Sequence, residues 1–302
     1  MRLTISILPF LGQSVLAAKW SIDGSCDLVG IADPGNGLDP FLMATDELKM
    51  SMNEAITMAE NAFNVMKDHA GDRHVSDMLK LALGEGAEYQ SKFDAVKETF
   101  ERVMAFEKEY AAGRPLDKIW QDTMTNDDVM VFCSNDHIKK DSSSSSQTKY
   151  YLDTSMKNTR YVSVEMDPST KRMQCHTVDY DIGNIKQGTM AFTTRSDFFN
   201  KDVIAQTQQP GFKGGITSYA LPVDGLRNLG LSMLHELTHT KQGGQLLDVR
   251  DLPSGVLSCY GWKCIQELKD PQNADNVAML GLALHLWTMG YYVDKDGNVN
   301  SK

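Results

Sequence analysis

The motif "HELTH" brings two histidines and a glutamate, His235, Glu236 and His239, into one short segment. Residues four apart on an α-helix lie on the same face, so both imidazoles can bind one ion. Such a pair typically binds zinc, and a carboxylate beside the first ligand can take a proton from water. The motif therefore predicts zinc ligands at His235 and His239 and a general base and acid at Glu236. The alternative is an ordinary amphipathic helix whose histidines face the core or the solvent.

A catalytic zinc needs a third protein ligand and one open position for water. The metzincin pattern would continue with a glycine and a histidine, where this chain has Gln242 and Gln245. A carboxylate must therefore supply the third ligand. We favour Asp248, because the Gly-Gly pair shortly before it lets the chain fold back toward the histidines. Asp251 and Glu267 are the alternatives.

The segments "HELTHT", "CYGWKC" and "NADNVAML", together with Asp248, resemble the deuterolysin-like zinc endopeptidases, or aspzincins, which include fungal lysine-specific metalloendopeptidases. Upstream, "NEAITMAENAF", "SKFDAVKETFERV" and "MAFTTRSDFF" resemble the first helices of that family and the strand before its zinc helix. The similarity covers about residues 45 to 290 and is strongest in the last quarter of the chain. It implies a zincin-like fold, a Zn2+ cofactor and hydrolysis of peptide bonds.

The functional residues of the family can be carried over by position. The resemblance implies that two histidines and an aspartate bind zinc, that the motif glutamate is the base and acid, and that a tyrosine assists the oxyanion. These positions are His235, His239, Asp248, Glu236 and Tyr260. The chain departs from the family in lacking Gly-Thr before Asp248 and in a longer spacing from Asp248 to Tyr260, which an inserted loop, "VRDLPSGVL", explains.

Asp275 and Tyr260 also have simpler interpretations. The family counterpart of Asp275 holds the basic side chain of the substrate in lysine-specific members, or orders the site, so Asp275 is a candidate substrate-binding residue. It could equally be the N-cap of the last helix, a position that aspartate favours. Tyr260 could be a core aromatic residue whose hydroxyl finds a partner.

The elements that must position these residues follow from the hydrophobic pattern. Apolar residues at helical spacing predict helices at about 43–68, at "HVSDMLKLAL" with Ser76 as N-cap and Gly84 as its end, at about 91–112, from about 226 through the motif, and at about 272–289. Short runs rich in β-branched and aromatic residues predict strands at "VMVFC", "TKYYLD", "RYVSVEM", "MQCHTVDY" and "TMAFTT". Helices, a small mixed sheet and helices again indicate an α+β fold. The motif helix and a C-terminal helix close a single zincin-like domain at 41–295, with a tail at 296–302.

The first eighteen residues, "MRLTISILPFLGQSVLAA", have the cation, apolar run and small residues of a secretory signal peptide, and 19–40 is a segment of unknown role. We therefore expect a secreted, extracellular protein with disulfides. Five cysteines follow the signal, so at least one cannot pair within the chain. Cys259 and Cys264 are expected to pin the wall beside the metal through separate disulfides, or to be small core residues.

The charge restricts the partners. A formal net charge of -10 argues against nucleic acid, because phosphate contacts need a basic surface. The chain is expected to act on protein or peptide substrates, away from membranes once the signal is removed, and its acidity makes a basic residue after the scissile bond plausible. The predicted function is a secreted zinc endopeptidase. The alternative is a secreted zincin-fold protein that binds a target with little or no catalysis.

Overall fold

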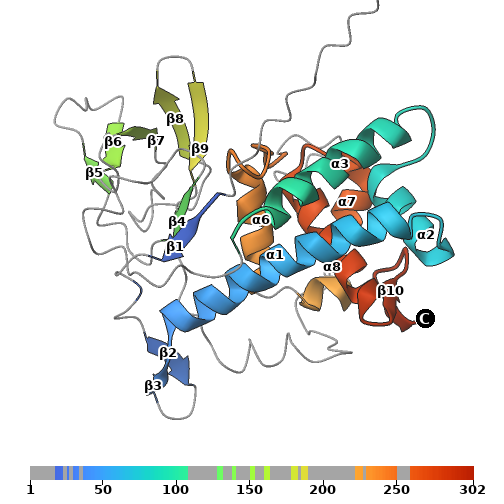
Figure 1. The fold of residues 1–302 in the computed structure, drawn as a ribbon, viewed down its shortest axis with the longest axis horizontal. Helices are drawn as coiled ribbons and strands as arrows, with labels where there is room; N and C mark the ends of the chain where they lie inside the picture. The colour runs from blue at the N-terminus through green and yellow to red at the C-terminus, as the bar shows by residue number, and fades with distance from the viewer. Residues whose placement is uncertain are drawn as a thin grey trace, which may run out of the picture.

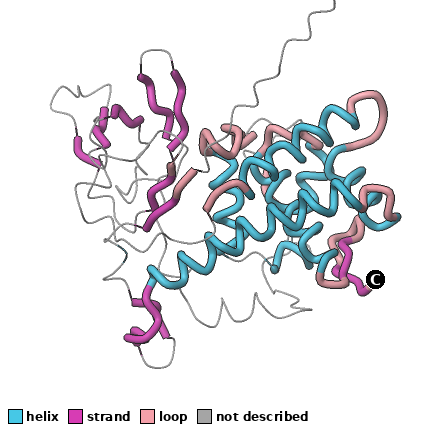
Figure 2. Tube along the Cα trace, in the orientation of Figure 1, coloured by secondary structure: helices cyan, strands magenta, loops and turns pink. Residues whose placement is uncertain are grey.

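The structure is a computed structural model of the 302-residue chain. It describes residues 18–22, 26, 30–33, 37–107, 128–131, 138–140, 150–153, 160–163, 178–182, 185–189, 222–226, 229–249 and 259–302. The helices gather on one side and most of the strands on the other (Figures 1 and 2). This segregation confirms the α+β prediction.

The first three helices of the chain are α1 (Ala44–Asp68), α2 (Arg73–Leu83) and α3 (Tyr89–Met104). All three match predicted helices, but two of their ends differ. α2 begins before Ser76, because the carboxylate of Asp72 caps it by accepting two N–H groups of the first turn at 2.9 and 3.2 Å. α3 ends at Met104 instead of near residue 112, because the next two N–H groups bond three residues back, as in a closing turn.

The C-terminal helices are α6 (Leu229–His239), α7 (Trp262–Leu268) and α8 (Ala274–Thr288), and a 3-10 turn, η3 (Pro222–Leu226), comes before them. α6 carries the motif. The helix was predicted to start at about Leu226, but that residue ends the 3-10 turn, and α6 starts at Leu229. α7 has no predicted counterpart, because seven residues are too few to show a helical period.

α6 lies in close contact with α1 and α8 (Figure 1). A Cβ atom added to Gly230 of α6 would lie 2.4 Å from a carboxylate oxygen of Glu54 on α1. A Cβ on Gly281 of α8 would lie 2.8 Å from Leu234 of α6. The side chains of Glu54 and Leu234 thus lie directly over the two glycines, and α6 packs closely between α1 and α8. The largest fully buried side chains of this core include Trp262, Phe100, Leu48, Met52 and Ile56.

The main sheet of the described residues is antiparallel throughout, in the order β5-β6-β7-β8-β9, so the prediction of a mixed sheet is wrong for it. Its strands are β5 (Ile138–Lys140), β6 (Tyr150–Asp153), β7 (Arg160–Ser163), β8 (Val178–Ile182) and β9 (Ile185–Thr189). Three of the predicted strands give β6, β7 and β8. Of "TMAFTT", the first residue ends β9 and the rest lies outside the described residues.

The remaining strands form three separate pairs. β1 (Trp20–Ile22) and β4 (Val129–Val131) are parallel, β2 (Gly30–Asp33) and β3 (Gly37–Met43) are antiparallel, and so are β10 (Tyr291–Val293) and β11 (Val299–Ser301). The predicted strand "VMVFC" contains β4, so it pairs with β1 and does not join the main sheet. Trp20 and Ile22 are buried in the core, so part of the segment at 19–40 is structural. Part of the expected C-terminal tail likewise forms β11.

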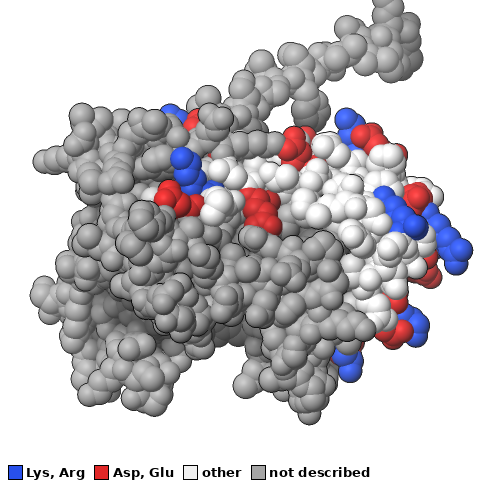
Figure 3. Space-filling view, turned by 90° about the horizontal axis from the view of Figure 1, so that it is seen from below, with Lys and Arg blue, Asp and Glu red and all other residues white. Residues whose placement is uncertain are grey.

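Two features relate to the predictions about nucleic acid and membranes: the charge on the surface and the length of the helices. In Figure 3, acidic and basic side chains of the described residues are interspersed on the visible face, and they form no broad basic surface there. No helix in the described part of the chain is both long and apolar enough to cross a membrane.

Candidate metal centre

The two motif histidines point toward each other from adjacent turns of α6. Nε2 of His235 lies 3.2 Å from Nε2 of His239, and both residues are buried. Nδ1 of His239 donates to the carbonyl oxygen of Leu246 at 2.7 Å, because a carbonyl can only accept. The lone pair of that ring is therefore on Nε2. Nδ1 of His235 faces the Asp275 carboxylate at 3.5 Å, which directs its Nε2 to the same point.

Asp248 completes the group. Its Oδ1 lies 3.2 Å from Nε2 of His235 and 3.7 Å from Nε2 of His239. Two ligands of a tetrahedral ion with bonds of about 2.1 Å are about 3.4 Å apart. A point about 2.1 Å from all three atoms exists, about 0.8 Å out of their plane. Among the described residues, His235, His239 and Asp248 thus form a group that could hold a metal ion.

Of the two other candidate ligands, the structure describes only Glu267. Glu267 is exposed on α7 and does not belong to it. Asp251 lies outside the described residues.

The loop after α6 reverses the chain and brings Asp248 to the histidines. Its N–H group at Leu246 bonds to the carbonyl of Thr238 at 3.0 Å, so the returning strand lies against the end of the helix. Gly244 has a φ of 110°, which favours glycine. At Gly243 an added Cβ would lie 1.9 Å from the carbonyl oxygen of Leu237. The Gly-Gly pair is therefore required for the fold-back that the sequence suggested.

A hollow of about 160 Å³ opens beside the group. It is lined by Leu231, Ser232, His235, Glu236, Tyr260 and Asp275. Glu236 therefore faces the same space as the metal ligand next to it. The ring of Tyr260 lies 5.9 Å from that of His235, and Tyr260 is 47% exposed. Tyr260 is therefore a wall of the hollow and not a core residue.

Asp275 connects the histidine to the Tyr260 loop. One carboxylate oxygen faces Nδ1 of His235, and the other accepts the backbone N–H of Gly261 at 2.6 Å. Only 3% of Asp275 is exposed. The N-cap of α8 is Asn273, so the capping interpretation of Asp275 is wrong. The carboxylate lies behind His235 and holds it against the Tyr260 loop.

Cys259 and Cys264 form a disulfide with each other, with 5.4 Å between their Cα atoms. The prediction of separate disulfides is therefore wrong. A bond across so few residues closes a small ring that contains Tyr260, and it restricts the wall of the hollow. Cys26 is also disulfide-bonded. Disulfides persist in oxidising surroundings, so they are consistent with the expected export.

The surroundings of His235 are strongly negative. Burial by itself lowers the pKa of this imidazole, but hydrogen bonds with Asp248 and Asp275 and the charge of Glu236 outweigh burial and raise the pKa to about 10. In the metal-free protein, the cluster therefore draws a proton to the ring. The same charges favour a bound cation at this point.

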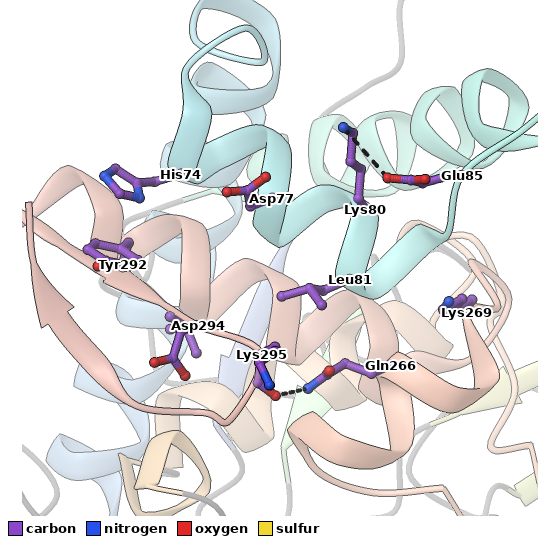
Figure 4. A pocket seen from close by; sticks show the side chains of 11 residues that line it. His74, Asp77, Lys80, Leu81, Glu85, Gln266, Lys269, Tyr292, Asp294 and Lys295 are labelled. Atoms are coloured by element: carbon purple, nitrogen blue, oxygen red, sulfur yellow. Dashed lines mark hydrogen bonds and ion pairs between the residues drawn. The ribbon is translucent and has the colours of Figure 1, made fainter.

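A larger hollow, of about 760 Å³, lies between α2, α7 and the β10–β11 hairpin (Figure 4). His74 stacks on Tyr292 at its edge, with ring centroids 3.9 Å apart. Lys80 and Glu85 form an ion pair across 3.6 Å. The lining mixes acids and bases and shares no residue with the metal group. The candidate metal centre therefore belongs with the smaller hollow.

Comparison of the chain with models of protein families, with curated proteins and with solved structures found no match. The site therefore has to be interpreted from its own geometry. All six residues predicted for it, His235, Glu236, His239, Asp248, Tyr260 and Asp275, lie in the metal group or line the hollow. Two contacts of the site were not predicted from the sequence. The carbonyl of Leu246, which accepts from His239, has no side-chain signal. The side chain of Asn273, which accepts from Val249 beside Asp248, looks like an ordinary helix cap in the sequence.

Proposed function

We propose that the chain is a zinc-dependent endopeptidase with a zincin-like fold, in which α6 is the active-site helix. One observation carries the proposal. The ligand atoms of His235, His239 and Asp248 surround a common point, and Glu236 faces the hollow beside it. A purely structural zinc site would be closed by a fourth protein ligand and would not need that carboxylate.

The donor set supports zinc. Two imidazoles and one carboxylate with an open position are typical of catalytic zinc, whereas calcium and magnesium prefer oxygen ligands. When bound, zinc would supply a Lewis acid that polarises a carbonyl and lowers the pKa of a bound water. The carbonyl of Leu246 and the carboxylate of Asp275 fix the two rings, as partners of metal-binding histidines commonly do.

The chain's own groups would then move the protons. Glu236 takes a proton from the attacking water and gives it to the leaving amine. Tyr260, exposed on the wall of the hollow, donates a hydrogen bond from its hydroxyl to the oxyanion. The ring closed by Cys259 and Cys264 keeps that wall in place.

Substrate preference needs separate treatment. Asp275 was the expected partner of a basic side chain, but both of its oxygens are directed to protein groups, at His235 and Gly261. Its position supports ordering of the site more than contact with substrate. A preference for a basic residue after the scissile bond is therefore tested with a peptide library, in which no enrichment of lysine or arginine there would remove it.

The decisive experiment compares wild type with Glu236→Gln on casein and measures bound zinc in both. We expect equal zinc content and at least about a 100-fold loss of turnover in Glu236→Gln, the usual scale for a general base. Glu267→Gln, a change on the exposed side of α7, is the matched control and should cleave normally.

The same experiment addresses the alternative, an exported binding protein without efficient catalysis. Zinc in every variant with cleavage in none would favour the binder. Absence of zinc from wild type would contradict the metal centre itself.

A further inference from the structure

The third ligand, Asp248, lies between two residues that are both anchored to Asn273. Leu247 forms a parallel β-bridge with Asn273, in which its N–H bonds to the carbonyl of Gln272 and its carbonyl accepts from Ala274, each at 2.9 Å. On the other side, the N–H of Val249 donates to Oδ1 of Asn273 at 3.0 Å. The backbone is thus held immediately before and after the ligand.

Side-chain packing holds this strand at Leu246, which is buried in the core, but not at Leu247, which is 61% exposed. From Leu247 onward, hydrogen bonds to the start of α8 hold the backbone on both sides of Asp248. The backbone bridge at Leu247 would form with any residue type at position 273, but the bond from Val249 needs an acceptor on that side chain.

Asn273 does not act as an ordinary N-cap. An asparagine at this position usually accepts an N–H of its own helix. Here its side chain makes no capping hydrogen bond and is directed to Val249 instead. The residue is 1% exposed, and its Nδ2 donates to Oδ1 of Asn276 at 3.0 Å.

Asn276 fixes this arrangement from behind. Its own Nδ2 lies 3.2 Å from the carbonyl oxygen of Ala82 in α2 and 3.3 Å from that of Ile265 in α7. Because Asn276 is 1% exposed, these bonds are shielded from water. The amide of Asn273 is thereby held in one orientation, with Oδ1 toward Val249.

We propose that Asn273 is a positioning residue for the third metal ligand: it sets the place of Asp248 through Val249 and so determines metal affinity. The inference rests on the proposed metal centre. It explains why the carboxylate reaches the histidines from a strand whose neighbouring side chain is exposed. Partners one step removed from a metal typically change affinity 10- to 100-fold when mutated.

The test measures zinc affinity by competition with a chromophoric chelator, using the full chain. Asn273→Ala should bind zinc about 10- to 100-fold more weakly than wild type. Asn273→Asp keeps an acceptor for the N–H of Val249 but loses the donor to Asn276, so its affinity should lie between those of wild type and Asn273→Ala. Gln242→Ala is the matched control: it removes a buried amide in the same loop, whose bond goes to the carbonyl of Arg102 in α3. It should leave affinity close to wild type.

The outcomes separate cleanly. Equal affinity for Asn273→Ala and wild type, or an equal loss in Gln242→Ala, would overturn the positioning role while leaving the metal centre in place. No zinc binding by wild type would overturn the proposed function instead. Should Asn273→Ala fail to fold, Asn273→Ser takes its place with the same two outcomes, because its hydroxyl is one atom too short to reach Val249.

Discussion

The fold-back of the loop after α6 can be tested at one glycine. In the structure, a Cβ at Gly243 would lie 1.9 Å from the carbonyl oxygen of Leu237, whereas ordinary van der Waals contact begins at about 3.5 Å. In Gly243→Ala, the loop and the helix end must separate by more than about 1 Å. Metal ligands tolerate only about 0.2 Å, and Asp248 follows in the same loop.

We therefore expect two effects of Gly243→Ala. The free energy of unfolding should fall by about 1–3 kcal/mol, as overpacking usually costs. Zinc affinity should fall by at least about tenfold, because the third ligand is displaced. Thermal denaturation of the metal-free protein measures the first effect, and chelator competition measures the second.

Gly71→Ala is the control, because a Cβ at that turn meets nothing within 4 Å. It should change neither quantity. If Gly243→Ala behaved like Gly71→Ala in both assays, the loop would not return against α6 as described, and the assignment of Asp248 as a ligand would lose its basis.

Three further predictions concern other parts of the structure. Asp248→Asn should abolish tight zinc binding in a chelator assay, and normal binding would contradict its role. Phe100→Ala, at a fully buried ring, should lower the free energy of unfolding by about 3–5 kcal/mol in denaturant titrations, and a loss below 1 kcal/mol would show that the site is not close-packed. The pKa of His235 is raised from 6.5 to about 10, so the metal-free protein should have this stabilisation in full below pH 6.5 and lose it as the pH rises toward 10. Melting temperatures recorded in chelator over that range, with His235→Gln for comparison, measure the slope, and equal slopes would refute it.

The sequence predicts the features that depend on local spacing. His235 and His239 follow from the helical period, and Asp248 follows from the Gly-Gly pair that permits a reversal. The long helix α1 is evident for the same reason, since its apolar residues repeat at helical spacing, whereas residues 274–284 of α8 are buried on all sides.

Features that depend on the actual contacts of a side chain are not predicted from spacing. Asp72 starts α2 because its carboxylate is in reach of two N–H groups, and spacing alone equally allowed Ser76. Nothing in the spacing of Cys259 and Cys264 shows whether they bond to each other or elsewhere. In the sequence Asp275 fits either a cap or a residue of the site, and only the packing of α8 on α6 shows that it faces His235.

One loop shapes two of the three candidate ligands. The carbonyl of Leu246 orients His239, and Asp248, two residues later, supplies the carboxylate. Disturbing the loop therefore removes both contributions together. Bound zinc would in turn fasten the loop at both places, so amide hydrogen exchange at residues 243–249 should slow further when zinc is added.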